Sequence, residues 1–265
     1  MNECGLDPGI DHMSACREID ALKKQGALIR EFYSHTGGLV EFSEHGNPWN
    51  YKITWNPHNV VGSGKDGAYF KKDGKNCFVP YHRIFNTHET LDIQEIGKFD
   101  VYYNRNSVQY APLYGLEDTD TIIRGTLRYS GFCATWQKLV DMGMTHANIK
   151  MNFNNVSMTD FISLFLDSSL YKGETVESRI TRDFQLTGLD LQKFHFLGLF
   201  NEEIKLNGLY SPADVLKERM IDKLSINEAE RDRIVMYHHL KSDLDGELKS
   251  KSLVLAAYGD DAATA

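Results

Sequence analysis

The chain has 265 residues, of which 42% are hydrophobic and 25% charged, and its formal net charge is −8. This composition is typical of a globular protein with a sizeable core, in one large domain or two modest ones. The acidic balance argues against a nucleic-acid partner, and no apolar run approaches the roughly 20 residues of a membrane span. The four cysteines are scattered, so we expect neither a metal site nor disulfides, and reduced thiols are typical of a cytoplasmic protein. We also expect no signal peptide.

The chain opens with a turn, Gly5-Leu-Asp-Pro-Gly9, in front of a predicted helix. Apolar residues recur at helical spacing from Ile10 onwards, and Gly26 ends the pattern. Asp7 is expected at the N-cap, with Pro8 as the first helical residue. A helix start presents free N–H groups that hold carboxylates and bind anions. Asp7 is therefore a capping residue, a site residue, or both.

Residues 27–36 alternate as a strand that ends at Gly37-Gly38, and a second strand is predicted over residues 51–55. The run from Gly62 to Gly67 has the spelling of a dinucleotide fingerprint, but such a fingerprint follows a strand and opens a helix. Pro57 precedes this run and a strand follows it, so we do not expect it to bind a nucleotide.

Two strands joined by a turn are predicted over residues 68–79, and an irregular stretch then leads to a strand near residues 99–103. Arg105 follows in a loop, and Ser107 is expected to cap a short helix that ends at Tyr114.

The strand over residues 121–129 places Ile122, Arg124, Thr126 and Arg128 on one face. Two guanidinium groups and a hydroxyl in a row suit carboxylate recognition, because an arginine fork grips a carboxylate through two parallel hydrogen bonds. The alternative is a half-exposed sheet whose wet face carries solvated arginines.

Downstream, the pattern predicts helices and then a hairpin that returns to the sheet through Asp245-Gly246. The helices span residues 134–142, 158–166, 190–199 and 212–224, and the hairpin strands span 234–240 and 248–258. We therefore expect an α+β fold with a mixed sheet. Residues 1–129 and 226–265 are expected to form its α+β domain, and residues 130–225 an all-helical insertion.

Several motifs resemble, in order and spacing, the saccharopine dehydrogenase family, and in particular its glutamate-forming members. The likeness is dense over residues 1–132 and thin from there to about residue 230. The matching stretches are residues 2–13, 37–39, 47–49, 51–55, 103–107, 113–116, 124–132, 230–232 and 255–260. The family's Rossmann-type domain has no counterpart here, so a dinucleotide-binding domain is expected to be absent from these residues.

The resemblance implies NAD(P)-dependent interconversion of saccharopine with glutamate and aminoadipate semialdehyde, in lysine metabolism. Saccharopine is a tricarboxylate, so at least two arginine clamps are expected. The resemblance implies a catalytic role for Asp7 beside substrate and nicotinamide, substrate contacts from Arg105, Thr126, Leu127 and Arg128, and cofactor contacts from Leu6, Asp7, Pro8 and Trp55. The resemblance makes residues 1–129 and 226–265 the substrate-binding and dimerisation domain. The cofactor is expected to be NADP or NAD, and a homodimer formed through the sheet is expected.

One departure from the family concerns Thr36, which stands where the family has a cysteine just before its Gly-Gly pair. A thiol role is thereby in doubt, although a hydroxyl can still hydrogen-bond a substrate group. Two other functions stay open: a related carboxy-polyamine reductase, which would need acidic groups for a cationic substrate tail, and a non-catalytic dimerisation module.

Overall fold

The computed structural model describes residues 5–41, 47–167 and 173–259. The chain divides into two units. The first unit comprises Met1–Glu41, Gly64–Cys133 and Ile226–Ala265, and the second comprises Phe42–Ser63 and Ala134–Ser225. Residues 42–63 therefore group with the inserted part of the chain, which corrects the boundary expected from the sequence. No helix among the described residues is long and apolar enough to span a membrane.

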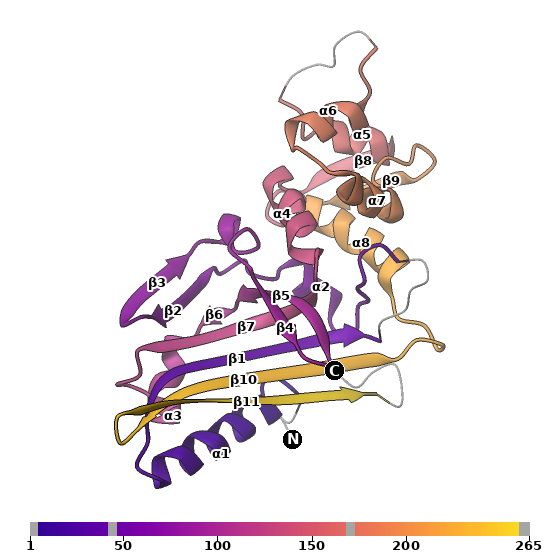
Figure 1. The fold of residues 1–265 in the computed structure, drawn as a ribbon. Helices are drawn as coiled ribbons and strands as arrows, with labels where there is room; N and C mark the ends of the chain where they lie inside the picture. The colour runs from indigo at the N-terminus through magenta and orange to yellow at the C-terminus, as the bar shows by residue number, and fades with distance from the viewer. Residues whose placement is uncertain (1–4, 42–46, 168–172, 260–265) are drawn as a thin grey trace. The chain divides into compact units, whose positions relative to one another are not determined.

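The first unit is built on a nine-stranded mixed sheet, as the sequence predicted (Figure 1). Its central strand β1 (Leu28–Val40) lies between β10 (Asp232–Leu244), which runs antiparallel to it, and β7 (Thr121–Tyr129), which runs parallel. The sheet order is β11-β10-β1-β7-β2-β3, with β11 (Glu247–Tyr258), β2 (Ala68–Lys72) and β3 (Lys75–Val79). Strands β4 (Glu89–Ile93), β5 (Gly97–Tyr103) and β6 (Arg105–Asn106) lie off this path, and β5 pairs with β7.

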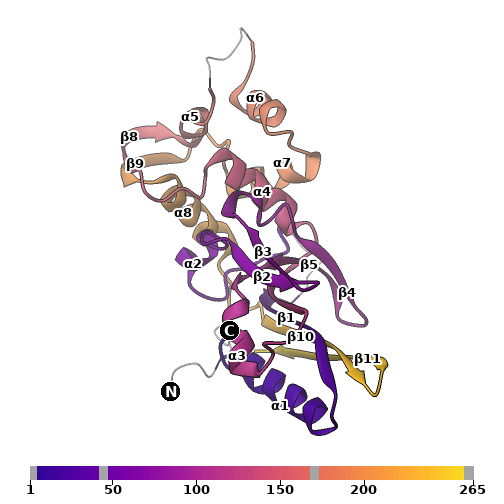
Figure 2. The same cartoon turned by 90° about the vertical axis from the view of Figure 1, so that its left-hand side faces the viewer.

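Helix α1 (Ile10–Lys24) packs on one face of this sheet (Figure 2). Ala15 and Ile19 of the helix meet Phe32, Ile122 and Leu240 of three neighbouring strands in one apolar cluster. Burying such side chains stabilises the fold by about 1.5–3 kcal/mol for each large one. The helix also buries Asp11 and Glu18, whereas Met13 is 64% exposed.

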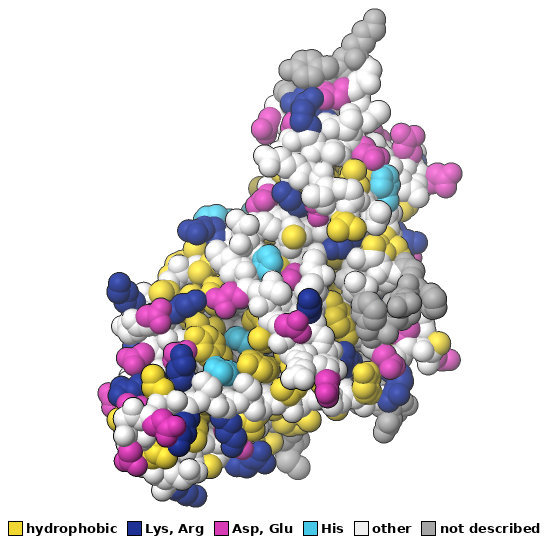
Figure 3. Space-filling view, in the orientation of Figure 1, with side chains coloured by type: hydrophobic (Ala, Val, Ile, Leu, Met, Phe, Trp, Pro, Cys, Tyr) yellow, Lys and Arg dark blue, Asp and Glu magenta, His cyan; other side chains and the backbone are white. Residues whose placement is uncertain are grey.

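The opposite face of the sheet has its own core, made by β1, β7 and β10 together with the β4–β5 hairpin. Farther along this face, the rings of Tyr33, His35, Tyr237 and His239 adjoin one another at centroid distances of 6.0–6.3 Å. Figure 3 shows histidine side chains among hydrophobic ones over the strands of the first unit. Short helical turns η1 (Tyr81–Arg83), η2 (Val108–Tyr110) and α3 (Ala111–Tyr114) complete the described part of the unit.

The second unit contains α2 (Pro57–Val61), α5 (Met158–Ser163), α6 (Val176–Asp183), α7 (Gly188–Leu197) and α8 (Pro212–Leu224), and α4 (Phe132–Met142) leads into it. It is not all-helical, because β8 (Met151–Ser157) and β9 (Lys205–Tyr210) form a two-stranded antiparallel sheet. Trp49 explains why residues 42–63 belong here. Its ring meets Trp136 edge-on at 6.1 Å, and its Nε1 donates to the carbonyl of Lys193 at 3.0 Å.

Two segments differ from their predicted secondary structure. Residues 51–55 were predicted as a strand, but Ile53 and Thr54 are both buried, and only Ile53 forms a bridge, to Ser225. Conversely, the stretch predicted to be irregular holds β4, which pairs with β5 along its whole length. Near Gly62 the expectation was right: a helix precedes the glycines and β2 follows them, the reverse of a dinucleotide fingerprint.

Candidate functional site

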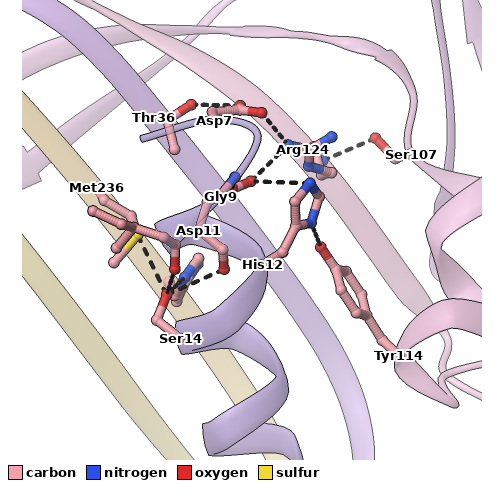
Figure 4. A network of polar contacts seen from close by, with 12 residues as sticks. Asp7, Gly9, Asp11, His12, Ser14, Thr36, Ser107, Tyr114, Arg124 and Met236 are labelled. Atoms are coloured by element: carbon pink, nitrogen blue, oxygen red, sulfur yellow. Dashed lines mark hydrogen bonds and ion pairs between the residues drawn. The ribbon is translucent and has the colours of Figure 1, made fainter. Parts of the chain in front are cut away.

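The centre of the candidate site is a single nitrogen of Arg124 on β7, shared between two carboxylates (Figure 4). Its Nη2 lies 2.8 Å from Oδ1 of Asp7 and 2.8 Å from Oδ2 of Asp11. The three side chains differ in depth: Asp11 is 1% exposed, Arg124 7% and Asp7 23%. The network therefore runs from a buried carboxylate, through a buried guanidinium, to a carboxylate that solvent reaches.

The turn before α1 places the two carboxylates. Its backbone closes on itself, because Ile10 N–H donates to the Gly5 carbonyl at 2.9 Å and Asp11 N–H to the Leu6 carbonyl at 3.0 Å. The N-cap of the helix is Gly9, and no side chain caps it. The expectation that Asp7 is the N-cap and Pro8 the first helical residue is therefore wrong, and the Asp7 carboxylate instead contacts residues of the sheet.

Thr36 on β1 is the second partner of Asp7. Its hydroxyl donates to Oδ2 of Asp7 at 2.8 Å, while Arg124 contacts the other carboxylate oxygen. Each oxygen of Asp7 thus has its own donor, which fixes the plane of the carboxylate. The hydroxyl at this departure from the family motif contacts Asp7 itself.

Aromatic and backbone contacts surround Arg124. The guanidinium carbon lies 4.3 Å from the centre of the Tyr110 ring, within the range of a cation–π interaction. The backbone N–H of Arg124 donates to the Ser107 hydroxyl at 2.9 Å. Ser107 was expected to cap the next helix, but its side chain makes no cap hydrogen bond and accepts from the strand instead.

Burial and charge set the protonation states in this network. Burial, followed by the negative charge of Asp7, raises the pKa of the Asp11 carboxyl, although Arg124 acts in the opposite direction. Burial disfavours the charge on Arg124, but the carboxylate of Asp7, with Tyr110 and Asp11, outweighs it and raises the pKa of the guanidinium. Arg124 is therefore a permanent cation between the two acidic groups.

A second layer of polar side chains supports the start of α1. Nδ1 of His12 hydrogen-bonds the Tyr114 hydroxyl, and its Nε2 lies 3.8 Å from Oδ2 of Asp11. Deeper in the sheet, Ser14 Oγ and His238 Nε2 are 2.8 Å apart, and burial lowers the pKa of His238 to about 4. His238 is therefore neutral at physiological pH.

Asp7, Asp11 and His12 each offer a ligand atom, and these atoms lie within 4.8 Å of one another. The geometry is that of a possible cation site. However, the Arg124 guanidinium already contacts both carboxylates and supplies the positive charge that an ion would bring. We therefore read the cluster as an ion-pair network.

Arg128, the predicted clamp, lies on the same face of β7 as Arg124 but is only 2% exposed. Its Nη1 donates to the Leu127 carbonyl at 2.9 Å, and its Nη2 lies 3.5 Å from the Tyr102 hydroxyl. Thr126 between the two arginines is partly buried. A wet, solvated strand face is thus excluded, since both arginines are buried.

The other predicted residues lie at different places. Leu6 and Pro8 flank Asp7 in the turn. Arg105 is exposed on β6 with a positive φ of 48°, and no hydrogen bond among the described residues joins its side chain to the Asp7 network. Trp55 belongs to the second unit and is 38% exposed. The structure therefore brings Asp7 together with Thr36 and Arg124, and not with Arg105.

Sequence reasoning missed Asp11 and did not single out Arg124 as a partner of Asp7. One signal was present: Asp11 lies four residues before Ala15 and eight before Ile19, on the buried line of the helix. A buried carboxylate needs a cationic or hydrogen-bonding partner. The partner lies more than 100 residues away on β7, which local patterns do not reveal.

The mixed sheet with its inserted unit is the fold of a known oxidoreductase. The apo, histidine-tagged saccharopine dehydrogenase (L-Glu forming) from Saccharomyces cerevisiae superposes with a TM-score of 0.87 at 29% identity, covering 98% of this chain and 60% of that one. The family model for the saccharopine dehydrogenase C-terminal domain matches residues 5–265. The chain therefore belongs to this family, which confirms the resemblance seen in the motifs.

Curated relatives agree with this assignment. The chain is 31% identical to the Saccharomyces cerevisiae protein named saccharopine dehydrogenase [NADP(+), L-glutamate-forming], over 98% of this chain and 59% of that protein. It is also 31% identical to the mitochondrial alpha-aminoadipic semialdehyde synthase of Rattus norvegicus, of which it covers 29%. The chain thus spans about three fifths of the yeast protein and less than a third of the rat protein.

Proposed function

We propose that the chain is the substrate-binding part of a saccharopine dehydrogenase-like oxidoreductase acting on a CH–NH bond. The reaction would be the NAD(P)-dependent interconversion of saccharopine with glutamate and aminoadipate semialdehyde. The observation that carries the proposal is Asp7, a partly exposed carboxylate in the turn that resembles the family's site, with both oxygens fixed by buried residues of the sheet. The names of the yeast and rat relatives support the same reaction.

The local charge suits a secondary amine. Two carboxylates and one guanidinium leave the network of Asp7, Asp11 and Arg124 with one net negative charge. Oxidation removes a hydride from the carbon beside the nitrogen and leaves a cationic iminium group, which water then hydrolyses. A bound nicotinamide supplies the hydride acceptor. Asp7 stabilises the positive charge that develops at nitrogen and can relay a proton there.

Arginines bind the substrate's carboxylates in this proposal. Arg128 is held by the Leu127 carbonyl and lies in low-dielectric surroundings, where an ion pair is stronger than in water. Thr126 is its neighbour on the same strand face, and its hydroxyl assists. Arg105 offers an exposed guanidinium for a second carboxylate. A cationic polyamine tail would find no such match, which favours saccharopine over a carboxy-polyamine.

The dinucleotide would be bound mainly by residues outside this chain, with Leu6, Asp7 and Pro8 of the first unit touching its reactive end. The run from Gly62 to Gly67 follows a helix and precedes a strand, so it provides no pyrophosphate cradle. We expect fluorescence titration of the 265-residue chain with NADPH to show no binding in the micromolar range. Micromolar binding would contradict this part of the proposal.

A homodimer would form through the sheet of the first unit. Within the part of the chain that the structure describes, strand β11 pairs on one side only, with β10, and soluble proteins usually cover or pair such edges. The partly buried rings of Tyr33, Tyr237 and His239 add accessible aromatic surface nearby. Sedimentation analysis is expected to show a dimer, and a monomer at high concentration would count against this interface.

The proposal is tested by turnover of saccharopine in a polypeptide that joins these residues to the nucleotide-binding domain. D7N should lower kcat by about a hundredfold or more, the usual range for removing an acid–base group. D243N is the matched control, because Asp243 is 25% exposed and lies 3.3 Å from Arg30. Its kcat should equal that of the wild type.

Turnover of a carboxy-polyamine in place of saccharopine would make the related reductase the correct assignment. Turnover of neither substrate, or an unchanged kcat in D7N, would overturn the proposed chemistry.

A further inference from the structure

The Asp7 carboxylate is tied to the body of the protein through an arginine that is itself tied to a deeper carboxylate. One nitrogen, Nη2 of Arg124, contacts both acids at 2.8 Å. Asp11, the deeper acid, is 1% exposed, so its contacts are shielded from water and from salt. Any displacement of the guanidinium therefore changes the position of Asp7.

Asp11 joins three elements of the first unit. Its Oδ1 accepts from the backbone N–H of Gly9 at 2.9 Å, which links it to the turn that carries Asp7. Its Oδ2 accepts from Arg124, which links it to β7. Its own backbone belongs to α1. The turn, the helix and the central sheet thus meet at one buried carboxylate.

The guanidinium has few other constraints. The Tyr110 ring covers one face at 4.3 Å, and this contact limits tilt but not rotation in the ring plane. Nε of Arg124 is buried and has no hydrogen-bond partner among the described residues. A buried donor without a hydrogen-bond partner lowers the stability of the folded protein, so Arg124 is not placed here for stability alone. Its orientation depends on the two carboxylates.

We propose that Arg124 is a positioning residue for Asp7 and that Asp11 is the anchor which orients Arg124. This inference rests on the proposed function, in which Asp7 touches the reacting nitrogen. Arg124 and Asp11 do not touch substrate in this scheme. They hold the Asp7 carboxylate in one plane and at one distance, and small errors in such placement reduce turnover steeply.

The alternative is that the network only stabilises the packing of the start of α1 on the sheet. A charge-balanced double variant separates the two roles. R124M leaves two acids without their shared cation and is expected to be strongly destabilised. D11N/R124M removes one negative and one positive charge, so the net charge of the network stays at minus one, as in the wild type. Thermal stability should recover in the double variant relative to R124M.

If Arg124 positions Asp7, kcat of D11N/R124M stays about tenfold to a hundredfold below the wild-type value although stability recovers. The KM for saccharopine should change much less than kcat, because the binding arginines are untouched. D11N alone keeps the pair of Asp7 and Arg124 and should lose less turnover than the double variant. D11N is expected to fold, so it keeps the test informative if R124M does not.

R233M is the matched control for removing a buried arginine. Arg233 is 7% exposed and binds the Tyr129 hydroxyl at 3.3 Å and the Ile96 carbonyl at 3.1 Å. Its removal should lower stability and leave kcat unchanged. The assays use the same polypeptide as for D7N, so the variants are directly comparable.

Recovery of both wild-type kcat and wild-type stability in D11N/R124M would show that the network has only a stabilising role, and it would overturn the positioning role of Arg124. A loss of turnover in D7N without any loss in the Arg124 variants would also overturn it, while leaving the proposed function intact. An unchanged kcat in D7N would overturn both proposals.

Discussion

The start of α1 and the starts of α6, α7 and α8 solve the same problem in different ways. The three helices of the second unit each begin with a capping box, in which Thr175, Thr187 or Ser211 exchanges hydrogen bonds with the residue three positions later. Helix α1 begins at Gly9 without a side-chain cap. Its first-turn acid, Asp11, accepts from Gly9 and forms an ion pair with Arg124 of the distant β7.

The difference separates residues that stabilise a helix from residues that build a site. A capping box satisfies backbone donors within four residues and needs nothing from the rest of the fold. The acids before and within α1 are held by β1 and β7, so their positions become fixed only when the sheet has formed. Departures from local rules of this kind are expected at functional sites.

Among the changes that test this comparison, the largest effect is expected at Arg128, the second buried arginine of β7. R128K keeps the charge but loses the planar fork, and a charged hydrogen bond is worth about 1.5–3 kcal/mol. Saccharopine affinity should therefore fall by about one to two orders of magnitude, as measured by calorimetry. If the affinity is unchanged and the melting temperature is lowered, Arg128 only stabilises the fold, as the capping residues do.

A smaller effect is expected at Thr36. T36V removes the hydroxyl that donates to Asp7 and keeps the shape of the side chain, so kcat should fall about fivefold to tenfold. T36S keeps the donor and should retain most of the turnover. Equal kcat values for the two variants would show that the hydroxyl does not orient Asp7.

The reciprocal change is S211A, at the start of α8. Ser211 accepts from Asp214 N–H at 3.2 Å and donates to the Asp214 carboxylate at 2.8 Å. The free energy of unfolding should fall by about 0.5–2 kcal/mol, measured by urea denaturation, while kcat stays unchanged. S225A, at the exposed end of the same helix, should stay within about 0.5 kcal/mol of the wild type.

Acid provides a further comparison of the two units, because each is expected to respond in its own pH window. Burial lowers the pKa of His35 and His238 in the first unit to about 4, so both are neutral when folded. The two neutral histidines contribute fully to stability above pH 6.5, which is the ordinary pKa of a histidine. This contribution is lost as pH falls from 6.5 towards 4, because only the unfolded chain binds the protons in that range. Hydrogen exchange of β1 should report this loss, and H238Q should reduce it.

The second unit should respond at lower pH. The side chain and backbone of Ser211 lower the pKa of Asp214 to about 2, from an ordinary 3.8. Stability from this carboxylate is present above 3.8 and is lost as pH falls towards 2, and D214N should lack this loss. The three tryptophans, Trp49, Trp55 and Trp136, all lie in the second unit, so tryptophan fluorescence follows it selectively. If hydrogen exchange of β1 and tryptophan fluorescence change over the same pH range, the two units do not differ in their response to acid.

The sequence predicted the elements whose signals are local. Strand β7 has the bounds expected from its β-branched residues, the turn between β2 and β3 lies at Asp73-Gly74, and Asp245-Gly246 joins β10 to β11. Helix α8 begins after Ser211 and contains Pro212 in its first turn, as predicted. In each case the determining residues lie within a few positions of one another.

The failures share a different cause, which is that a distant partner decides the outcome. Ser107 and Asp7 both have side chains suited to capping, yet β7 and β1 engage them instead. Residues 51–55 alternate like a strand but lack a neighbour to complete a ladder. Burial of Asp11 beside Arg124 was equally invisible, since the ion pair joins the first turn of α1 to a strand about midway along the chain.

The central position of β1 has a consequence for how the protein is made. The strand over residues 28–40 leaves the ribosome well before its antiparallel neighbour, which spans residues 232–244. Until that segment is synthesised, β1 has one edge without hydrogen-bond partners, and pairing across so long a separation is slow. We expect nascent chains that stop before β10 to aggregate or to bind chaperones, and the sheet of the first unit to form completely only after β10 and β11 have emerged.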